Sequence, residues 1–290
     1  MPDKYRIELR DVSNVAASKT AKIILPVGPR YHYVGLVHGY AGGTNTLAGV
    51  ATNINEIRMK RNTKIQRICS GTQLRDLNVL NGTGFDFGLS TSVPNTAPGV
   101  VVPIYLAEPW RQDEVDQDAL AWATSNWPDF QIEVDLGAAA TPTLTAFAVV
   151  DNTPAKAGQG IVKWFRDQIA AQGLKFDSRL DTQDFLQQIS LYPDSGGTNA
   201  ATRVTFRRNT SDILHELSNL ENQVLLSQYQ MTPNAAGRTA NIYDLVLDHD
   251  GLLASAINLG AANNASLTIE AAGAMSGTIT ALIQRFGTPE

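Results

Sequence analysis

The sequence predicts an all-β protein made of two tandem β-sandwich domains with a few short inserted helices. Short segments of alternating apolar and polar residues, separated by clusters of turn residues, dominate the chain. The second half also repeats the order of elements found in the first half. The 290 residues are 43% hydrophobic and 18% charged, which allows two cores and leaves fewer charges than the roughly 25% of an average soluble domain. Such a surface is typical of a protein that packs against copies of itself.

The clearest strand lies in Phe130–Leu136, where apolar residues occupy every second position and Gln, Glu and Asp lie between them. Six further segments carry strand patterns: Thr20–Val27, Tyr31–His38, Ile54–Lys60, Lys64–Cys69, Val100–Leu106 and Thr143–Val150. Turn or loop residues separate them at Ala41–Asn45, at Asn81 and Gly82, and at Pro94–Pro98. Many short strands with few helices indicate a sandwich or a barrel.

Two short helices interrupt this pattern. Thr72 is expected to cap a helix that carries Leu74, Leu77 and Leu80. A second helix is predicted over Glu114–Thr124, and its apolar face is formed by Val115, Ala119, Trp122 and Ala123.

The repeat is seen most directly near the end of each half. Thr143–Phe147 matches Thr278–Leu282, and Ile132–Leu136 matches Leu267–Ala271 at the same offset of 135 residues. Two further matches are expected. The strand ending at Cys69 and the helix after it correspond to Val204–Arg208 and to a helix at Ser211–Leu220. The strand Pro103–Pro109 and the following Glu114–Ala123 correspond to Ile242–Leu247 and Leu252–Ile257. A period this long indicates a duplicated domain, because solenoid repeats span about 20–50 residues.

The boundary between the halves is placed in the small polar stretch Asn152–Gly160, which gives domains 1–152 and 153–290. The next segment, Ile161–Ala171, has the spacing of an amphipathic helix. Its equivalence to the opening strand of the first half favours a strand.

Charge and cysteine content exclude several classes of protein. The net charge of -5 and the absence of a basic arm argue against direct binding of nucleic acid. Cys69 is the only cysteine and is expected to be a buried, inert thiol. No signal peptide and no run approaching the roughly 20 apolar residues of a membrane span is present. Synthesis in a host cytoplasm is therefore expected.

No catalytic constellation is apparent in the sequence. His32, His38, His215 and His249 are scattered, and none has a metal spacing with Cys69. His32 and His38 share a strand face and could approach each other, but two ordinary strand histidines are the favoured interpretation. Gly39–Thr44 lacks the Lys-Ser/Thr of a phosphate loop, and no Gly-x-Ser-x-Gly elbow occurs.

Two acidic groups have the oxygen ligands that calcium prefers. The first group is Asp113, Glu114, Asp116 and Asp118, where the helix dipole accounts for the acids without a metal. The second is Asp248 and Asp250, where a simple turn is the favoured interpretation. We therefore expect no cofactor and no metal site, with Asp248 and Asp250 as the weak candidates for a structural calcium.

The four tryptophans, Trp110, Trp122, Trp127 and Trp164, lie mainly around the first inserted helix. They can form a sugar-stacking platform, but packing in a core or at a subunit interface is the favoured interpretation.

Several segments in order along the chain resemble one family of proteins. They are Asn14–Ala17, Ile23–Gly28, Leu106–Pro109, Ile132–Asp135, Ala138–Ala140, Leu144–Ala146 and Leu225–Tyr229. With these segments the sequence resembles the major coat proteins of tailless, membrane-containing icosahedral bacteriophages, most of all those of the corticovirus type. The stretch Thr153–Thr202 matches poorly, and the loop Gly82–Gly99 is longer than the family pattern.

The resemblance implies two eight-stranded jelly rolls in tandem and a structural role without catalytic residues. It also implies a homotrimer that forms a pseudo-hexameric capsomer of the virion capsid, with vertex and membrane-associated virion proteins as neighbours and a peripheral contact with an internal membrane. By analogy, Met1–Ser18 and Arg285–Glu290 are expected to be docking tails, so deleting Met1–Ser18 should leave folded trimers and impair shell assembly.

Two other classes remain open from the residues alone. A carbohydrate- or receptor-binding jelly-roll protein of a virion needs an aromatic and acidic pocket in both halves, and the tryptophans are not repeated. A bicupin-type enzyme needs paired His and Glu ligands, which the scattered histidines do not supply.

Overall fold

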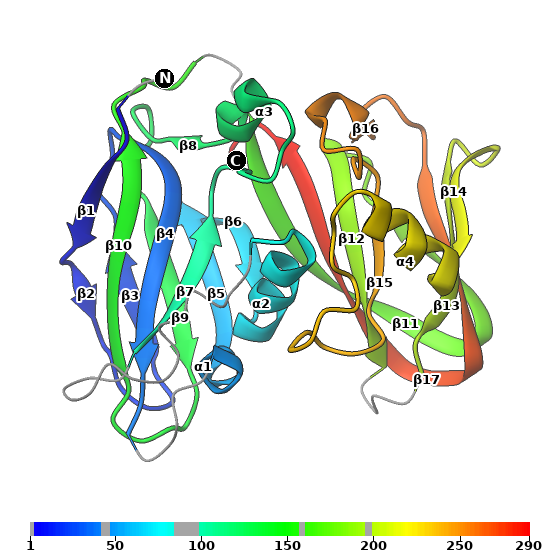
Figure 1. Ribbon diagram of the computed structural model, residues 1–290, viewed down its shortest axis with the longest axis horizontal. Coiled ribbons are helices and arrows are strands. Elements are labelled where there is room, and N and C mark those ends of the chain that lie inside the picture. Colours follow the sequence, from blue (N-terminus) through cyan, green and yellow to red (C-terminus); the bar gives the residue numbers. More distant parts are fainter. Residues whose placement is uncertain (1–2, 42–46, 84–98, 157–159, 195–198) are drawn as a thin grey trace. The chain divides into compact units, whose positions relative to one another are not determined.

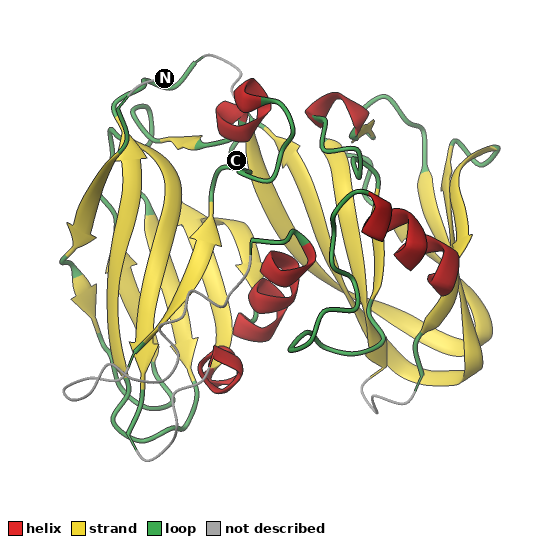
Figure 2. Cartoon of the chain, viewed as in Figure 1, coloured by secondary structure: helices red, strands yellow, loops and turns green. Residues whose placement is uncertain are grey.

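The computed structural model describes residues 3–41, 47–83, 99–156, 160–194 and 199–290. These residues form two compact units (Figures 1 and 2). Unit 1 contains Met1–Val162 and Thr288–Glu290, and unit 2 contains Lys163–Gly287. The predicted turns at 42–45 and 94–98, and most of the loop Gly82–Gly99, lie outside the described residues.

Unit 1 has two antiparallel sheets. The first has the strand order β1 (Tyr5–Leu9), β10 (Thr143–Asp151), β4 (Arg30–Gly39) and β7 (Val100–Tyr105), with the short β8 (Trp122–Ala123) also paired to β4. The second has the order β2 (Val12–Ser13), β3 (Thr20–Ile24), β9 (Gln131–Leu136), β5 (Ile54–Arg61) and β6 (Lys64–Cys69). Along the chain, strands pass from one sheet to the other and back in the order of a jelly roll.

The core of unit 1 lies between these sheets. The alternation predicted for Phe130–Leu136 is present, since Ile132 and Val134 are fully buried and lie opposite Met59 and Ile57 of β5. Burial of such side chains stabilises the sandwich by about 1.5–3 kcal/mol each. Cys69 is buried at the end of β6, as expected.

A tight hairpin and a capped helix follow one another in unit 1. Asn62 and Thr63 connect β5 to β6 with φ angles of 47° and 69°, the pattern of a two-residue hairpin turn. Helix α2 (Gly71–Leu80) begins directly after β6, and Ser70 with Gln73 forms a capping box at its start. Ser70 therefore caps the helix, and the predicted cap at Thr72 is wrong by two residues.

Unit 2 repeats this arrangement. Its elements are β11 (Ile161–Leu180), β12 (Phe185–Asp194), β13 (Ala201–Arg208), β14 (Asp212–Ser218), α4 (Asn219–Gln228), β15 (Tyr243–Val246), the 3-10 helix η1 (Leu253–Ser255), β16 (Ile257–Asn258) and β17 (Ala265–Gly287). One sheet has the order β14-β13-β17-β11, and β12 pairs with β15, β16 and β17 in the other.

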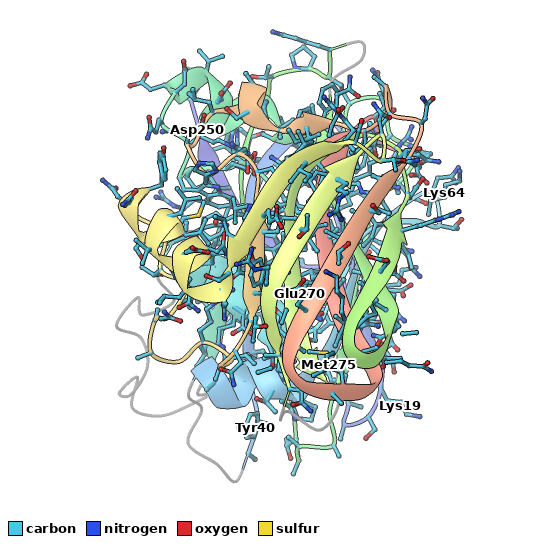
Figure 3. The ribbon with its side chains drawn as sticks, turned by 90° about the vertical axis from the view of Figure 1, so that its right-hand side faces the viewer. Lys19, Tyr40, Lys64, Asp250, Glu270 and Met275 are labelled. Carbon is cyan, nitrogen blue, oxygen red and sulfur yellow. The ribbon has the colours of Figure 1, made fainter. Side chains whose placement is uncertain are left out.

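Strand β17 contributes to both sheets of unit 2 and corresponds to β9 and β10 together. Its first part, residues 265–271, pairs with β13, and residues 279–286 pair with β12. The strand bends between these parts, where Met275 is buried and Gly277 has a φ of 96° (Figure 3). The long β11 contains a similar glycine, Gly173, at a φ of 81°, a conformation that few other residues adopt. Ile161–Ala171 is thus a strand, as favoured.

The hairpin and the capped helix also recur in unit 2. Asn209 and Thr210 have φ angles of 54° and 65° between β13 and β14, and Ser218 with Glu221 forms the capping box of α4. In each unit a buried Asn of the helix, Asn78 or Asn222, donates to a carbonyl of the strand that follows. These matched details support a duplicated domain.

Two predicted helices differ from the structure. The helix expected at Ser211–Leu220 is strand β14 followed by α4, because Asp212–Ser218 pairs with β13 across the hairpin and Ser218 caps the helix that begins at Asn219. The helix expected over Glu114–Thr124 ends early: α3 spans Glu114–Ala119, and Trp122 and Ala123 form β8 against β4.

The expected terminal tails are also part of the fold. Within Met1–Ser18, β1 pairs with β10 over five residues and β2 pairs with β3, and Leu9 is buried. At the other end, Arg285–Gly287 belongs to β17. Arg61 then donates to the carbonyls of Pro289 and Glu290, at 3.2 and 2.9 Å. Neither end is a free docking tail in the described residues.

Candidate assembly surfaces and a buried charge network

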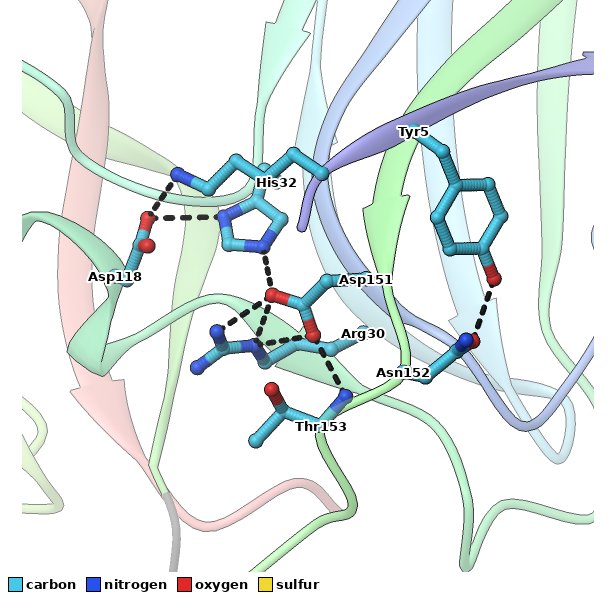
Figure 4. Close-up of polar contacts among 8 residues, drawn as sticks. Tyr5, Arg30, His32, Asp118, Asp151, Asn152 and Thr153 are labelled. Atoms are coloured by element: carbon cyan, nitrogen blue, oxygen red, sulfur yellow. Dashed lines mark hydrogen bonds and ion pairs between the residues drawn. The ribbon is translucent and has the colours of Figure 1, made fainter. Parts of the chain in front are cut away.

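A connected group of polar side chains in unit 1 surrounds His32 (Figure 4). His32 and Arg30 lie at the start of β4, and Asp151 ends β10 directly opposite Arg30. The Asp151 carboxylate accepts from Arg30 Nη2 at 2.6 Å, from His32 Nε2 at 2.7 Å and from the Thr153 amide at 2.7 Å. On the other side of the ring, His32 Nδ1 lies 2.9 Å from Asp118 Oδ1. This oxygen also accepts from Lys4 Nζ at 2.9 Å.

The electrostatics of this network follow from its hydrogen bonds. An ionised carboxylate only accepts hydrogen bonds, and His32 places one ring nitrogen against each of two carboxylates. Burial opposes the ionisation of Asp151, but the hydrogen bonds from Arg30, Thr153 and His32 outweigh it and hold the pKa of Asp151 well below its usual range. The network therefore links β4, β10, α3 and the N-terminal segment through charge-assisted hydrogen bonds.

A second buried cation lies on β6. Arg67 is almost fully buried, and its guanidinium donates to the carbonyls of Val162 and Tyr105 at 2.8 and 2.5 Å. The guanidinium also lies 4.9 Å from the ring of Trp122, a cation–π distance. Burial lowers the pKa of Arg67 to about 9. These two hydrogen bonds go to backbone carbonyls, so Arg67 has a structural role in the packing of unit 1.

The two histidines of β4 have separate partners, in line with the favoured interpretation as ordinary strand histidines. His38 lies at the other end of the strand, where its ring nitrogens contact the Thr143 carbonyl at 2.8 Å and Asn53 Oδ1 at 3.0 Å. Both histidines are buried and fixed by structural partners.

The carboxylates with a possible calcium role have partners within the chain. Asp250 accepts from the Leu252 amide at 3.0 Å and from the Ser255 hydroxyl at 2.5 Å, and Asp248 accepts from Gln187 at 3.4 Å. In the first acidic group, Asp113 caps α3 and Asp118 belongs to the His32 network. Among the described residues, no cluster of three or more His, Cys, Asp or Glu is arranged to hold a metal.

Three of the four tryptophans are buried, and the fourth, Trp110, is half-buried. Trp122, Trp127 and Trp164 are buried, and Trp122 and Trp127 contact Phe130 at ring distances of 5.4 and 5.3 Å. Trp110 packs edge-on against Tyr105. A sugar platform made of the tryptophans is therefore not formed.

The exposed apolar side chains mark surfaces that can associate. Those of unit 1 include Tyr5, Ile24, Val27, Ile65 and Val115, and those of unit 2 include Leu174, Phe185, Ile213, Leu220, Val224, Tyr229 and Leu252. Within the described residues, no helix is both long and apolar enough to cross a membrane.

Sequence reasoning had identified His32 and Asp118 but not their connection. Asp151 was missed, although it lies opposite Arg30 at the end of the predicted strand Thr143–Val150. Aligning the predicted strands would have placed Asp151, one residue beyond the predicted strand end, opposite Arg30. That pairing of opposite charges was the available signal.

Comparison with known proteins agrees with this architecture. The chain is similar over 99% of its length to the major capsid protein P2 of bacteriophage PM2, with 98% of that chain covered, a TM-score of 0.78 and 17% identity. A chain in the atomic structure of Sulfolobus turreted icosahedral virus is similar over 99% of this chain and 91% of its own length, with a TM-score of 0.69 and 12% identity. A chain of the PBCV-1 virus capsid is similar over 98% of this chain and 93% of its own length, with a TM-score of 0.64 and 12% identity.

At these identities the structural matches show a shared fold. No curated protein sequence matches the chain. The family model described as viral coat protein P2 N-terminal domain matches residues 6–151, just over half of the chain. The chain therefore belongs to this family of viral coat proteins, whose role is structural and not enzymatic.

Proposed function

We propose that three copies of the chain form a capsomer with a pseudo-hexagonal outline, and that these capsomers tile an icosahedral shell. The observation that carries this proposal is the duplication of the jelly roll in one chain, down to the Asn-Thr hairpins and the serine capping boxes. A threefold assembly of a duplicated chain presents six similar units, and six similar edges suit a hexagonal lattice.

The proposed partners follow from this geometry. A pseudo-hexagonal capsomer does not fit a fivefold axis, so the vertices of the shell need a different virion protein. We further propose that the shell encloses a membrane that the subunit touches only at its periphery, together with membrane-associated virion proteins. Direct binding of nucleic acid is not proposed, because the chain has a net charge of -5. No cofactor is part of the proposal.

The solution mass of the purified protein tests the trimer. Light scattering coupled to size exclusion should give three times the chain mass of 31.3 kDa, or the mass of larger closed particles. A monomer at every concentration and ionic strength would contradict the proposal. Flotation with lipid vesicles tests the membrane contact separately, and a coat protein that inserts irreversibly would contradict a peripheral contact.

A further inference from the structure

The chain passes between the two units at two points. It leaves unit 1 after Val162 and enters unit 2 at Lys163, and it returns to unit 1 after Gly287. Domain boundaries usually lie in exposed, flexible linkers that few contacts cross. Neither crossing has such a linker in the described stretches 160–163 and 285–290, because Val162 and Lys163 are buried and β17 extends to Gly287.

Two neighbouring residues of β6 hold the main chain of both crossings within unit 1. The buried Arg67 donates from Nε to the Val162 carbonyl at 2.8 Å. The buried Gln66 donates to the Glu290 carbonyl at 3.3 Å and accepts from the Glu290 amide at 3.1 Å. Arg61 of β5 also donates to the Glu290 carbonyl, at 2.9 Å. All these hydrogen bonds go to main-chain atoms, so they fix the path of the chain whatever the side chains at 162 and 290 are.

A single carboxylate holds both crossings within unit 2. Lys163 Nζ lies 2.5 Å from Asp184 Oδ2, and little of either side chain is exposed. Gly287 lies directly against the same carboxylate, since a Cβ atom at position 287 would collide with it. The Asp184 carbonyl accepts from the Leu259 amide at 3.0 Å, which fixes this residue in place. Consecutive residues of the chain are therefore held on different units at both crossings.

The jelly roll itself does not require the polar pair of β6. Strands β6 and β14 are equivalent, because each follows an Asn-Thr hairpin and has a register shift after the same number of pairs. Their alignment places Leu214 and His215 where unit 1 has Gln66 and Arg67. His215 contacts the Tyr243 hydroxyl within unit 2. Gln66 and Arg67 thus belong to the crossings and not to the fold.

We propose that these contacts form a double clamp that makes the two units unfold as one cooperative unit, although each unit has its own core. The double clamp consists of Arg61, Gln66 and Arg67 in unit 1 and Asp184 in unit 2. Unfolding of either unit pulls a crossing out of the clamp, because no slack residue separates the held positions. Buried donors of Gln66 and Arg67 then lose their acceptors, which is costly. This coupling acts within a single chain and does not depend on the proposed capsomer.

Differential scanning calorimetry of the full chain tests the coupling. The wild type should melt in a single transition, with equal calorimetric and van't Hoff enthalpies. Q66L/R67M removes the hydrogen bonds from β6 to both crossings, and it places at 66 the residue type that β14 has there. We expect this variant to melt in two transitions at least about 5 °C apart.

A second variant changes only the main chain of the returning crossing. E290P removes the amide hydrogen that Gln66 accepts, and it leaves the buried side chains of unit 1 in place, so it tests the clamp even if Q66L/R67M does not fold. We expect the ratio of van't Hoff to calorimetric enthalpy to fall below about 0.8. E290A is the matched control, because it keeps the amide and should melt like the wild type.

A core variant separates uncoupling from simple loss of stability. I132V removes one methyl group from the buried core of unit 1 and leaves the clamp intact. It should lower the Tm by a few degrees and keep a single transition. Each protein is scanned at two concentrations tenfold apart, because a transition that reports dissociation of copies shifts with concentration and an intrachain transition does not.

Three results would overturn the double clamp. The first is a wild type that already melts in two transitions independent of concentration. The second is a single transition with equal enthalpies in both Q66L/R67M and E290P, since the crossings would then not couple the units. The third is an I132V variant that splits as widely as Q66L/R67M, since any loss of stability in unit 1 would then produce the same effect.

Discussion

Replacing Asp151 with Asn should destabilise unit 1 far more than the removal of an ordinary surface charge. The Asp151 side chain has no exposed surface and accepts from Arg30, His32 and the Thr153 amide at 2.6–2.7 Å. The Asn side chain keeps the volume but removes the charge and turns one acceptor into a donor. The Arg30 side chain is only 11% exposed, so its charge would lose a buried counterion, and the 5% exposed His32 would lose a hydrogen-bond acceptor.

The expected loss is about 3–5 kcal/mol of unfolding free energy, the range for breaking one partner of a buried ion pair. Urea unfolding of wild type and D151N, followed by the fluorescence of the buried Trp122 and Trp127, measures it. E8Q is the matched control, because Glu8 pairs with Arg10 at 2.9 Å on an exposed surface. Such pairs contribute about 0–1 kcal/mol.

The pH dependence gives a second check. The pKa of Asp151 is lower in the folded protein than in the unfolded chain, so its stabilisation is complete above the unfolded value of about 3.9 and is lost as the pH falls below it. The difference between wild type and D151N should therefore shrink under acid conditions. A loss below about 1 kcal/mol at neutral pH, or a loss equal to that of E8Q, would refute the reasoning.

Three further predictions use other parts of the chain. Burial, together with repulsion from His249, lowers the pKa of His215 to about 4. The free energy of unfolding should therefore fall as the pH drops from about 6.5 towards 4, and H215Q should reduce the difference between the urea midpoints at pH 5 and 7. An unchanged difference would show that another group causes the pH dependence. Deleting residues 1–10 should lower the Tm by more than about 5 °C, because β10 loses its partner β1 and Leu9 leaves the core; an unchanged Tm would show that β1 does not contribute to the fold. EDTA or added calcium should change the Tm by less than about 1 °C, because the Asp250 carboxylate already accepts hydrogen bonds within its turn. A rise in Tm that depends on the calcium concentration would indicate a binding site.

The strands of the first unit could be predicted because their alternation is local. A half-buried strand must place apolar residues at every second position, and Gln131–Leu136 does so without interruption. The duplication was visible where β17 repeats β9 and β10, because the same inward-facing positions recur there.

Elements whose identity depends on long-range partners could not be predicted. Helical spacing is present in Ile213, Leu214, Leu217 and Leu220. However, Asp212–Ser218 pairs with β13 across a hairpin, and this pairing outweighs the local spacing. The Asn-Thr turn and the Ser-x-x-Glu capping box were the available signals. Likewise, Trp122 and Ala123 are held in β8 by pairing with β4.

The polar network was harder to predict than the fold. Arg30 and His32 lie far from Asp118 and Asp151 in the sequence, and only strand register and the packing of α3 bring the two carboxylates to them. Residue types alone left His32 as an ordinary strand histidine.

Electron microscopy of the purified assembly tests the central claim most directly. If three duplicated chains form each capsomer, class averages viewed along the symmetry axis should show six similar lobes with threefold symmetry. Particles with two lobes, or rings whose lobe number is not six, would contradict the account.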